Sequence, residues 1–238
     1  MARLPRFDLA DIPQHVVQRG NNRLPCFLDD GDRSRYLTLL KDALLKNRCR
    51  LHAYVLMSNH VHLLVTPPET GAIGRMMQQL GRNYVSLFNA RHHRTGTLWE
   101  GRYKACLVDN EDYVLRCYRY IELNPVRACM IDDAAAYRWS SCAANTGLLL
   151  CSDLHPHPAY LALGADIAER CQAYRGLLEE TMPYDVIQQI RVYLQQQRAL
   201  GRDSFQNMVA AKMRRFAGIR PAHRPCSQDG PESKSSDK

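Results

Sequence analysis

The sequence predicts an α+β fold in which an antiparallel sheet carries two helices on one face and further helices follow. Two patterns lead to this prediction. Apolar residues alternate with a period of two in several short segments, which is typical of half-buried strands. In longer segments they recur every three to four residues, which is typical of amphipathic helices.

The first two elements are a strand and a helix. Residues 12–19, IPQHVVQR, are expected to form a short strand, which Asn21-Asn22 then interrupts. Residues 29–48 carry apolar side chains at helical spacing and predict an amphipathic helix.

A β-hairpin is expected next. Residues 51–57 and 60–66 both alternate, and the tight turn Ser58-Asn59 separates them. In the first of these strands, four apolar residues are expected to share one face: Leu51, Ala53, Val55 and Met57. Pro67-Pro68 ends the second strand.

A helix at residues 72–90, an extended segment at 97–108 and a third helix complete the first part of the chain. Asn110 can cap the third helix, with Glu111 and Asp112 in its first turn. Because Pro125 disfavours helical backbone at Asn124, the helix should end near there. The first six elements match the ferredoxin-like arrangement, to which the third helix is an addition.

The chain has 238 residues, enough for one to two domains. We expect a first domain at 1–145, a loop-rich linker at 146–157, a helical extension of four short helices at 158–217, and a disordered tail at 218–238. The extension contains several arginines and one lysine, which suit DNA binding. The alternative is that it only packs on the first domain.

The composition favours a cytoplasmic protein with a polyanionic partner. The net charge is +8, and the nine cysteines are irregularly spaced, which indicates reduced, mostly buried thiols. Neither a secretory signal nor a membrane span is expected. Basic residues and aromatics are interleaved between 75 and 104, which indicates either a phosphate-binding surface or a solvated helix and loop. The candidate DNA-binding residues there are Arg82, Arg91, Arg94, Arg102 and Lys104.

His60 and His62 are the first candidate site residues. Residues i and i+2 of a strand point to the same face, so both imidazoles can converge on one ion. Val61, Leu63 and Val65 then face the helices. The alternative is a pair of structural histidines.

Tyr120 and Asn124 are the second pair. They lie four residues apart on the third helix, roughly 40° from one another around its axis, whereas Tyr118 lies on a different face. If Asn124 is a metal ligand, Tyr120 is therefore the tyrosine beside it. The alternatives are a packed aromatic residue and a polar helix terminus.

Together these four residues would make a coherent site. Two neutral imidazoles and an amide oxygen suit a catalytic divalent ion with open coordination positions, and they are too few for a closed structural zinc site. A tyrosine beside such an ion is a candidate nucleophile toward a phosphate, which would give a covalent phosphotyrosine.

Three segments resemble those of single-tyrosine HUH transposases, and most of all the REP-associated tyrosine transposases: MSNHVHLLVTP (57–67), TGTLWEGRYKA (95–105) and YRYIELNPVRA (118–128). The resemblance covers about residues 1–145. It implies a ferredoxin-like catalytic domain, Mg²⁺ or Mn²⁺, and cleavage of single-stranded DNA near hairpins through a 5′-phosphotyrosine. His60, His62 and Asn124 match the metal ligands, and Tyr120 matches the nucleophile. The resemblance leaves open whether the protein is a monomer or a homodimer.

Two other functions compete with this interpretation. A protein of the same fold could bind repetitive hairpin DNA without cutting it, although the four intact site residues argue against a lost activity. An RNA-binding module of this fold would carry aromatic residues on neighbouring strands for base stacking, whereas residues 60–66 offer histidines.

Overall fold

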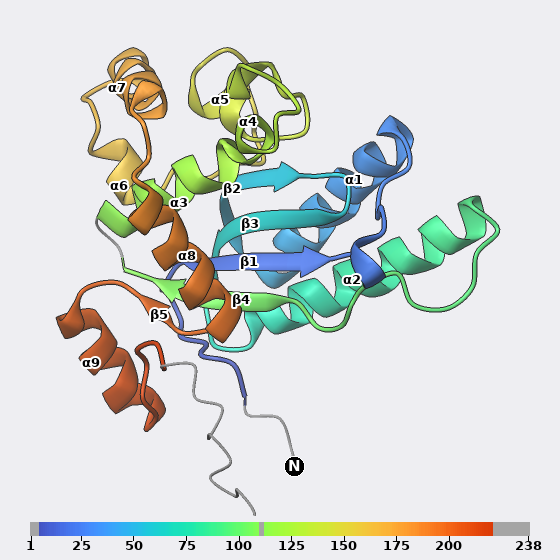
Figure 1. The fold of residues 1–238 in the computed structure, drawn as a ribbon, viewed down its shortest axis with the longest axis horizontal. Coiled ribbons are helices and arrows are strands. Elements are labelled where there is room, and N and C mark those ends of the chain that lie inside the picture. The colour runs from blue at the N-terminus through green and yellow to red at the C-terminus, as the bar shows by residue number, and fades with distance from the viewer. Residues whose placement is uncertain (1–4, 110–111, 221–238) are drawn as a thin grey trace, which may run out of the picture.

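In the computed structural model of the protein, the described residues are 5–109 and 112–220. They form a mixed five-stranded sheet of order β2-β3-β1-β4-β5 with helices on both faces (Figure 1). The strands are β1 (Gln14–Arg19), β2 (Arg50–Leu56), β3 (His60–Thr66), β4 (Lys104–Val108) and β5 (Ala199–Leu200). The first four pair antiparallel, and β5 pairs parallel with β4. The predicted α+β class is confirmed.

Helices α1 (Asp30–Asn47) and α2 (Ala72–Arg91) pack side by side on one face of the sheet, here called the α1/α2 face. Asp29 caps α1, because its Oδ1 accepts the main-chain N–H of Asp32 at 2.9 Å. The core between these helices is aromatic, with the rings of Phe27, Tyr36 and Tyr84 in mutual contact.

The opposite face is covered by α3 (Asp112–Glu122), which packs on β2 and β3, and by α8 (Tyr184–Gln196), which packs on β4. It is called the α3/α8 face, and Figure 1 shows α8 crossing in front of the sheet. The remaining helices are α4 (Asn124–Arg127), α5 (Cys142–Asn145), α6 (Pro158–Leu161), α7 (Ile167–Glu179) and α9 (Asp203–Met213), with 3₁₀ turns η1 (Asn21–Arg23) and η2 (Ala134–Ala136).

The hairpin differs from the prediction at one residue. The β2–β3 register shifts between Leu51 and Ala53, which marks a β-bulge. Leu51 therefore packs with the α1/α2 core, whereas Ala53, Val55 and Met57 pack on the α3/α8 face. The expectation that all four share one face was wrong for Leu51, because a bulge reverses the alternation.

The extended segment is also shorter than predicted, since β4 begins only at Lys104. Upstream, Trp99 forms an isolated bridge with Gly20 and is buried against Tyr84. The third helix ends at Glu122, near the predicted end, and Pro125 then lies in the first turn of α4. The predicted cap, Asn110 with Glu111, lies outside the described residues.

Residues 158–217 contain the four expected helices, α6 to α9, but also the unexpected strand β5. Because β5 extends the sheet and α8 covers one face of it, this part of the chain shares a core with the first 145 residues. The segment at 146–157 is also attached to the sheet, where His155 N donates to Leu51 O at 2.7 Å. The predicted domain boundaries themselves stay a prediction.

Among the described residues, eight cysteines are free thiols and six of these are buried, as expected. Cys226 lies outside the described residues. No helix within residues 5–109 and 112–220 is long and apolar enough to cross a bilayer.

A buried carboxylate joins α3 to the later helices. Glu122 is fully buried, and its oxygens accept from Asn145 Nδ2 at 2.7 Å, from Tyr174 OH at 2.6 Å and from Ser141 Oγ. Burial raises the pKa of Glu122, while the three donors oppose that rise. The network therefore connects the C-terminal end of α3 with α5 and α7.

Replacing Glu122 with alanine should destabilise the protein by about 3 kcal/mol or more, because three buried donors lose their acceptor. Urea unfolding measures this change. Glu122→Gln is the matched control: it keeps the volume and one acceptor oxygen, so less than half of that loss is expected. A Glu122→Ala protein within about 1 kcal/mol of wild type would contradict the proposed importance of the network.

Candidate functional site: a histidine pair beside a tyrosine

The two histidines of β3 lie on the α3/α8 face, as predicted. Val61, Leu63 and Val65 pack into the core beneath α1 and α2, so the alternate residues point the other way. The rings of His60 and His62 are 5.1 Å apart, and His62 is only 4% exposed. The strand alternation therefore brings both imidazoles together at one place.

A third histidine, which the sequence analysis did not single out, completes this cluster. His15 on β1 is fully buried, and its Nε2 lies 2.8 Å from Nδ1 of His62. In the register, His62 lies opposite Val17, two residues from His15 on the same face. The sequence shows a histidine within an apolar strand, but its position beside His62 follows only from the pairing of β1 with β3.

Hydrogen bonds orient the ring of His60. Its Nδ1 lies 2.6 Å from Oδ1 of Asn59. An amide oxygen only accepts, so the network assigns the proton to Nδ1 and leaves a lone pair on Nε2. His60 therefore presents an unprotonated nitrogen away from Asn59.

All three imidazoles are neutral near pH 7. Burial lowers the pKa of His15 to about 3 and that of His60 to about 4, with a further contribution from Arg19 at His60. Burial, followed by the neighbouring His15 and His60, also lowers the pKa of His62 well below its ordinary value. Neutral imidazoles are the form that binds metal ions.

Tyr120 from α3 packs against this cluster. Its ring lies edge-on to His62 at 5.8 Å and to His15 at 5.6 Å between centroids. Asn124 lies one turn further on, and its Nδ2 donates to the main-chain oxygen of Tyr120 at 3.0 Å. The structure thus brings together His60, His62 and Tyr120, with Asn124 adjacent to Tyr120 as helical geometry predicted.

Two arginines beside these residues were also missed. The guanidinium of Arg127 lies 4.5 Å over the ring of Tyr120 and donates to the main-chain oxygen of Tyr120. Burial lowers the pKa of Arg127 to about 10, so it stays charged near neutral pH. Arg19 is exposed and lies directly opposite His60 in the register. The place of Arg19 opposite His60 follows only from the pairing of β1 with β3, and Arg127 lies beyond the predicted end of the third helix.

The two neighbouring tyrosines differ in how their hydroxyls are used. Tyr118 is fully buried, and its hydroxyl accepts the main-chain N–H of His157 at 3.2 Å. Within the described part of the chain, the hydroxyl of Tyr120 has no hydrogen-bond partner. Tyr118 is therefore a structural residue, whereas the hydroxyl of Tyr120 is available.

The five candidate DNA-binding residues have different surroundings. Lys104 lies opposite Val17 in the register, as His62 does, so it shares the α3/α8 face roughly 10 Å from His62. Arg91 forms ion pairs with Asp29 and Asp32. Arg94 and Arg102 are exposed on the loop before β4.

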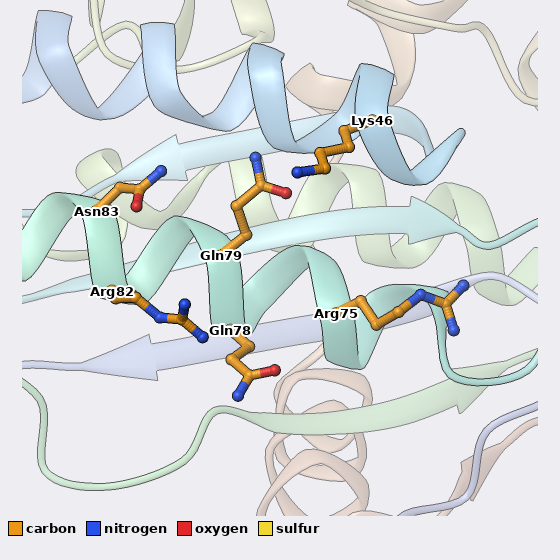
Figure 2. Close-up of a pocket in the computed structure, with 6 residues that line it drawn as sticks. All are labelled: Lys46, Arg75, Gln78, Gln79, Arg82 and Asn83. Carbon is orange, nitrogen blue, oxygen red and sulfur yellow. The ribbon is translucent and has the colours of Figure 1, made fainter.

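Arg82 lies away from the histidines. It lines a polar pocket of about 280 Å³ between α1 and α2, on the opposite side of the sheet (Figure 2). The other residues of this pocket are Lys46, Arg75, Gln78, Gln79 and Asn83. The strand register thus places Lys104 on the histidine face, whereas Arg82 lies on the other side of the sheet.

Comparison with known proteins finds one family that part of the chain resembles. The family described as "Transposase IS200 like" matches residues 9–124, a range that contains His60, His62 and Tyr120 and ends at Asn124. The match covers 116 of the 238 residues, so this part of the chain is similar to IS200-like transposases. It supports a transposase role, and transposases cut and rejoin DNA. No curated protein matches the chain.

Two solved structures are similar to this chain. A REP-associated tyrosine transposase bound to a REP hairpin superposes with a TM-score of 0.50 at 16% identity, over 65% of this chain and 92% of that one. At this identity the likeness supports the fold alone. A protein from Deinococcus radiodurans described as a transposase gives a TM-score of 0.36 at 21% identity, over 54% and 92% of the two chains, which adds nothing to the fold comparison.

The two neighbouring tyrosines, Tyr118 and Tyr120, should differ in their effect on stability. Tyr118→Phe leaves a buried N–H without its acceptor and should cost about 1–3 kcal/mol. Tyr120→Phe removes no hydrogen bond and should change the free energy of unfolding by less than about 0.5 kcal/mol. Denaturant unfolding of both variants compares them, and equal losses would show that the hydroxyl of Tyr120 is also structural.

Proposed function

We propose that the protein is a metal-dependent single-strand DNA transposase and endonuclease that uses Tyr120 as its nucleophile. The observation that carries this proposal is the edge-on contact of Tyr120 with His62, 5.8 Å between ring centroids, beside His60. A free hydroxyl next to two neutral imidazoles is the arrangement that attack on a metal-bound phosphate requires.

The donor set fits Mg²⁺ or Mn²⁺. The Nε2 lone pairs of His60 and His62, together with Oδ1 of Asn124, would supply three neutral ligands to such an ion, which when bound would also attract phosphate oxygens. Because Nδ2 of Asn124 is engaged with the main chain of Tyr120, Oδ1 is the atom left for coordination. When bound, the ion would neutralise charge on the phosphate under attack.

His15 acts as a positioning residue in this proposal. A ligand role for His62 requires an unprotonated Nε2, and its Nδ1–H then donates to Nε2 of His15 at 2.8 Å. Such a hydrogen bond fixes both the tautomer and the orientation of the ring. Since His15 is buried in β1, the sheet itself holds His62 in place.

The reaction consists of one displacement at phosphorus. The oxygen of Tyr120 forms a bond to the phosphorus and gives up its proton, while the bond to the 3′-oxygen breaks and that oxygen takes up a proton. The products are a 5′-phosphotyrosine and a free 3′-OH, and the reverse displacement rejoins the strand. Arg127 places positive charge against the ring of Tyr120, where it can stabilise the charged phosphate.

The proposed substrate is single-stranded DNA near hairpins of the REP type. The similar solved structure contains a REP hairpin, which supports this choice of substrate for the present chain. A second candidate function is non-catalytic binding of repetitive hairpin DNA. The unengaged hydroxyl of Tyr120 favours the enzyme, because a binding protein has no need to keep that group free.

The direct test is adduct formation on hairpin-bearing single-stranded DNA with Mn²⁺. Wild type should give a covalent protein–DNA species on a denaturing gel, and Tyr120→Phe should reduce it by at least about a hundredfold, since the nucleophile is absent. A chelator should also abolish it. Tyr118→Phe is the matched control and should still form the adduct.

An adduct that survives Tyr120→Phe but disappears in Tyr118→Phe would overturn the assignment of the nucleophile. Binding without any adduct would favour the non-catalytic function. Cleavage that persists in chelator would remove the metal from the proposal.

The role of His15 has a separate test, the affinity for Mn²⁺ measured by calorimetry without DNA. His15→Ala should weaken binding by about 10–100-fold, because the ring of His62 loses its orienting partner. His15→Gln should restore part of the affinity, because its amide oxygen can accept from Nδ1 of His62. Unchanged affinity in His15→Ala would refute the positioning role, whereas unchanged affinity in His60→Ala would refute the ligand set.

A further inference from the structure

Three arginines gather at the β5 edge of the sheet, away from the histidines. Arg198 immediately precedes β5, and Arg215 follows α9. Their guanidinium carbons lie 5.7 Å and 3.9 Å from the centre of the same ring, that of Phe7. Arg220 completes the group, since its charge acts on both of the other arginines.

Hydrogen bonds hold the main chain and side chains of this group in place. Arg198 Nη1 donates to Phe216 O, and Arg215 Nη1 donates to Pro5 O, both at 2.7 Å. The side-chain amide of Gln196 both donates to and accepts from the main chain of Arg220, at 2.8 Å in each case. The segment that carries the arginines is therefore anchored to α8 and to the N-terminal segment.

No carboxylate neutralises these arginines. Among the described residues, none of the three forms an ion pair with an acid, whereas nearby Arg202 is paired with Asp109. Burial, and then the neighbouring arginines, lower the pKa of Arg198 and of Arg215. Clustered like charges cost free energy, and an anion bound among them would remove that cost.

An exposed aromatic residue follows Arg215 directly in the chain. Phe216 is 55% exposed, and its main-chain oxygen is the acceptor for Arg198. An exposed ring beside guanidinium groups is the combination that binds single-stranded nucleic acid, because bases stack on the ring while the cations contact the backbone phosphates. A duplex would offer phosphates but no unstacked base.

We propose that Arg198, Arg215, Arg220 and Phe216 form a second binding site, which takes the phosphate backbone and a base of single-stranded DNA. The site lies three strands from β3, roughly 14 Å across the sheet. Naming DNA as the ligand rests on the proposed function. The site would hold the DNA next to the segment that is bound at Tyr120. It would add affinity for DNA without taking part in cleavage.

Fluorescence anisotropy with a mixed-sequence single strand tests this site. All proteins carry Tyr120→Phe and chelator is present, so binding is measured without cleavage or metal. The result therefore does not depend on whether the catalytic proposal is correct. Arg220→Gln should weaken binding and reduce the slope of log affinity against log salt by about 0.7, the value for one phosphate contact on a single strand. Phe216→Ala should weaken single-strand binding roughly tenfold and leave duplex binding unchanged.

Lys46→Gln is the matched control, because Lys46 is an exposed cation on the α1/α2 face. It removes the same charge and should leave the slope unchanged. Thermal unfolding checks the fold: Arg220→Gln should be at least as stable as its parent, because removal of one like charge relieves repulsion.

Three outcomes would overturn the proposal. An equal loss of slope in Lys46→Gln would show that only net charge matters. If Arg220→Gln lost affinity only for duplex DNA, and Phe216→Ala had no effect on single-strand binding, the arginines would be assigned to paired strands. Inorganic phosphate could stabilise the parent protein but not Arg220→Gln, while the two proteins bind DNA with equal affinity. That result would make this a site for a free anion.

Discussion

The edge-on packing of Tyr120 against His62 and His15 is the contact on which the rest of the site depends. It requires β3 to be an interior strand, so that His62 is buried and His60 half-buried, and it requires α3 to cross the face to which they point. It also requires α1 and α2 to cover the other face, because Val61 and Leu63 need an apolar environment there. The sheet with helices on both faces is therefore the condition for bringing a tyrosine from one element to histidines from two others.

Burying polar groups beside that contact has a cost that hydrogen bonds offset. The facing nitrogens, Nε2 of His15 and Nδ1 of His62, satisfy one another within the sheet, and Glu122, two residues after Tyr120, receives three donors. Because those donors come from α5, α7 and the turn before α5, the later part of the chain helps to fix the orientation of α3. The same part of the chain contributes β5 and the arginines beside it, so it also forms the β5 edge of the sheet.

Regular periodicity in the sequence predicted much of the site. Alternation placed His60 and His62 on one face, and the helical repeat placed Tyr120, not Tyr118, beside Asn124, because both depend only on local backbone geometry. His15 was missed because its role depends on the pairing of β1 with β3, which alternation alone does not specify. The β-bulge at Leu51 and the strand β5 were missed for a similar reason, since both arise from contacts between residues far apart in the sequence.

The central claim is that the hydroxyl of Tyr120 bonds to DNA. Mass spectrometry of the adduct tests it directly, because trypsin cuts after Arg116, Arg119 and Arg127 and so separates the two neighbouring tyrosines into different peptides. The mass of the attached nucleotide should appear on the peptide of residues 120–127 and be absent from the peptide of residues 117–119. A nucleotide found on residues 117–119, or on any peptide outside residues 120–127, would contradict the account.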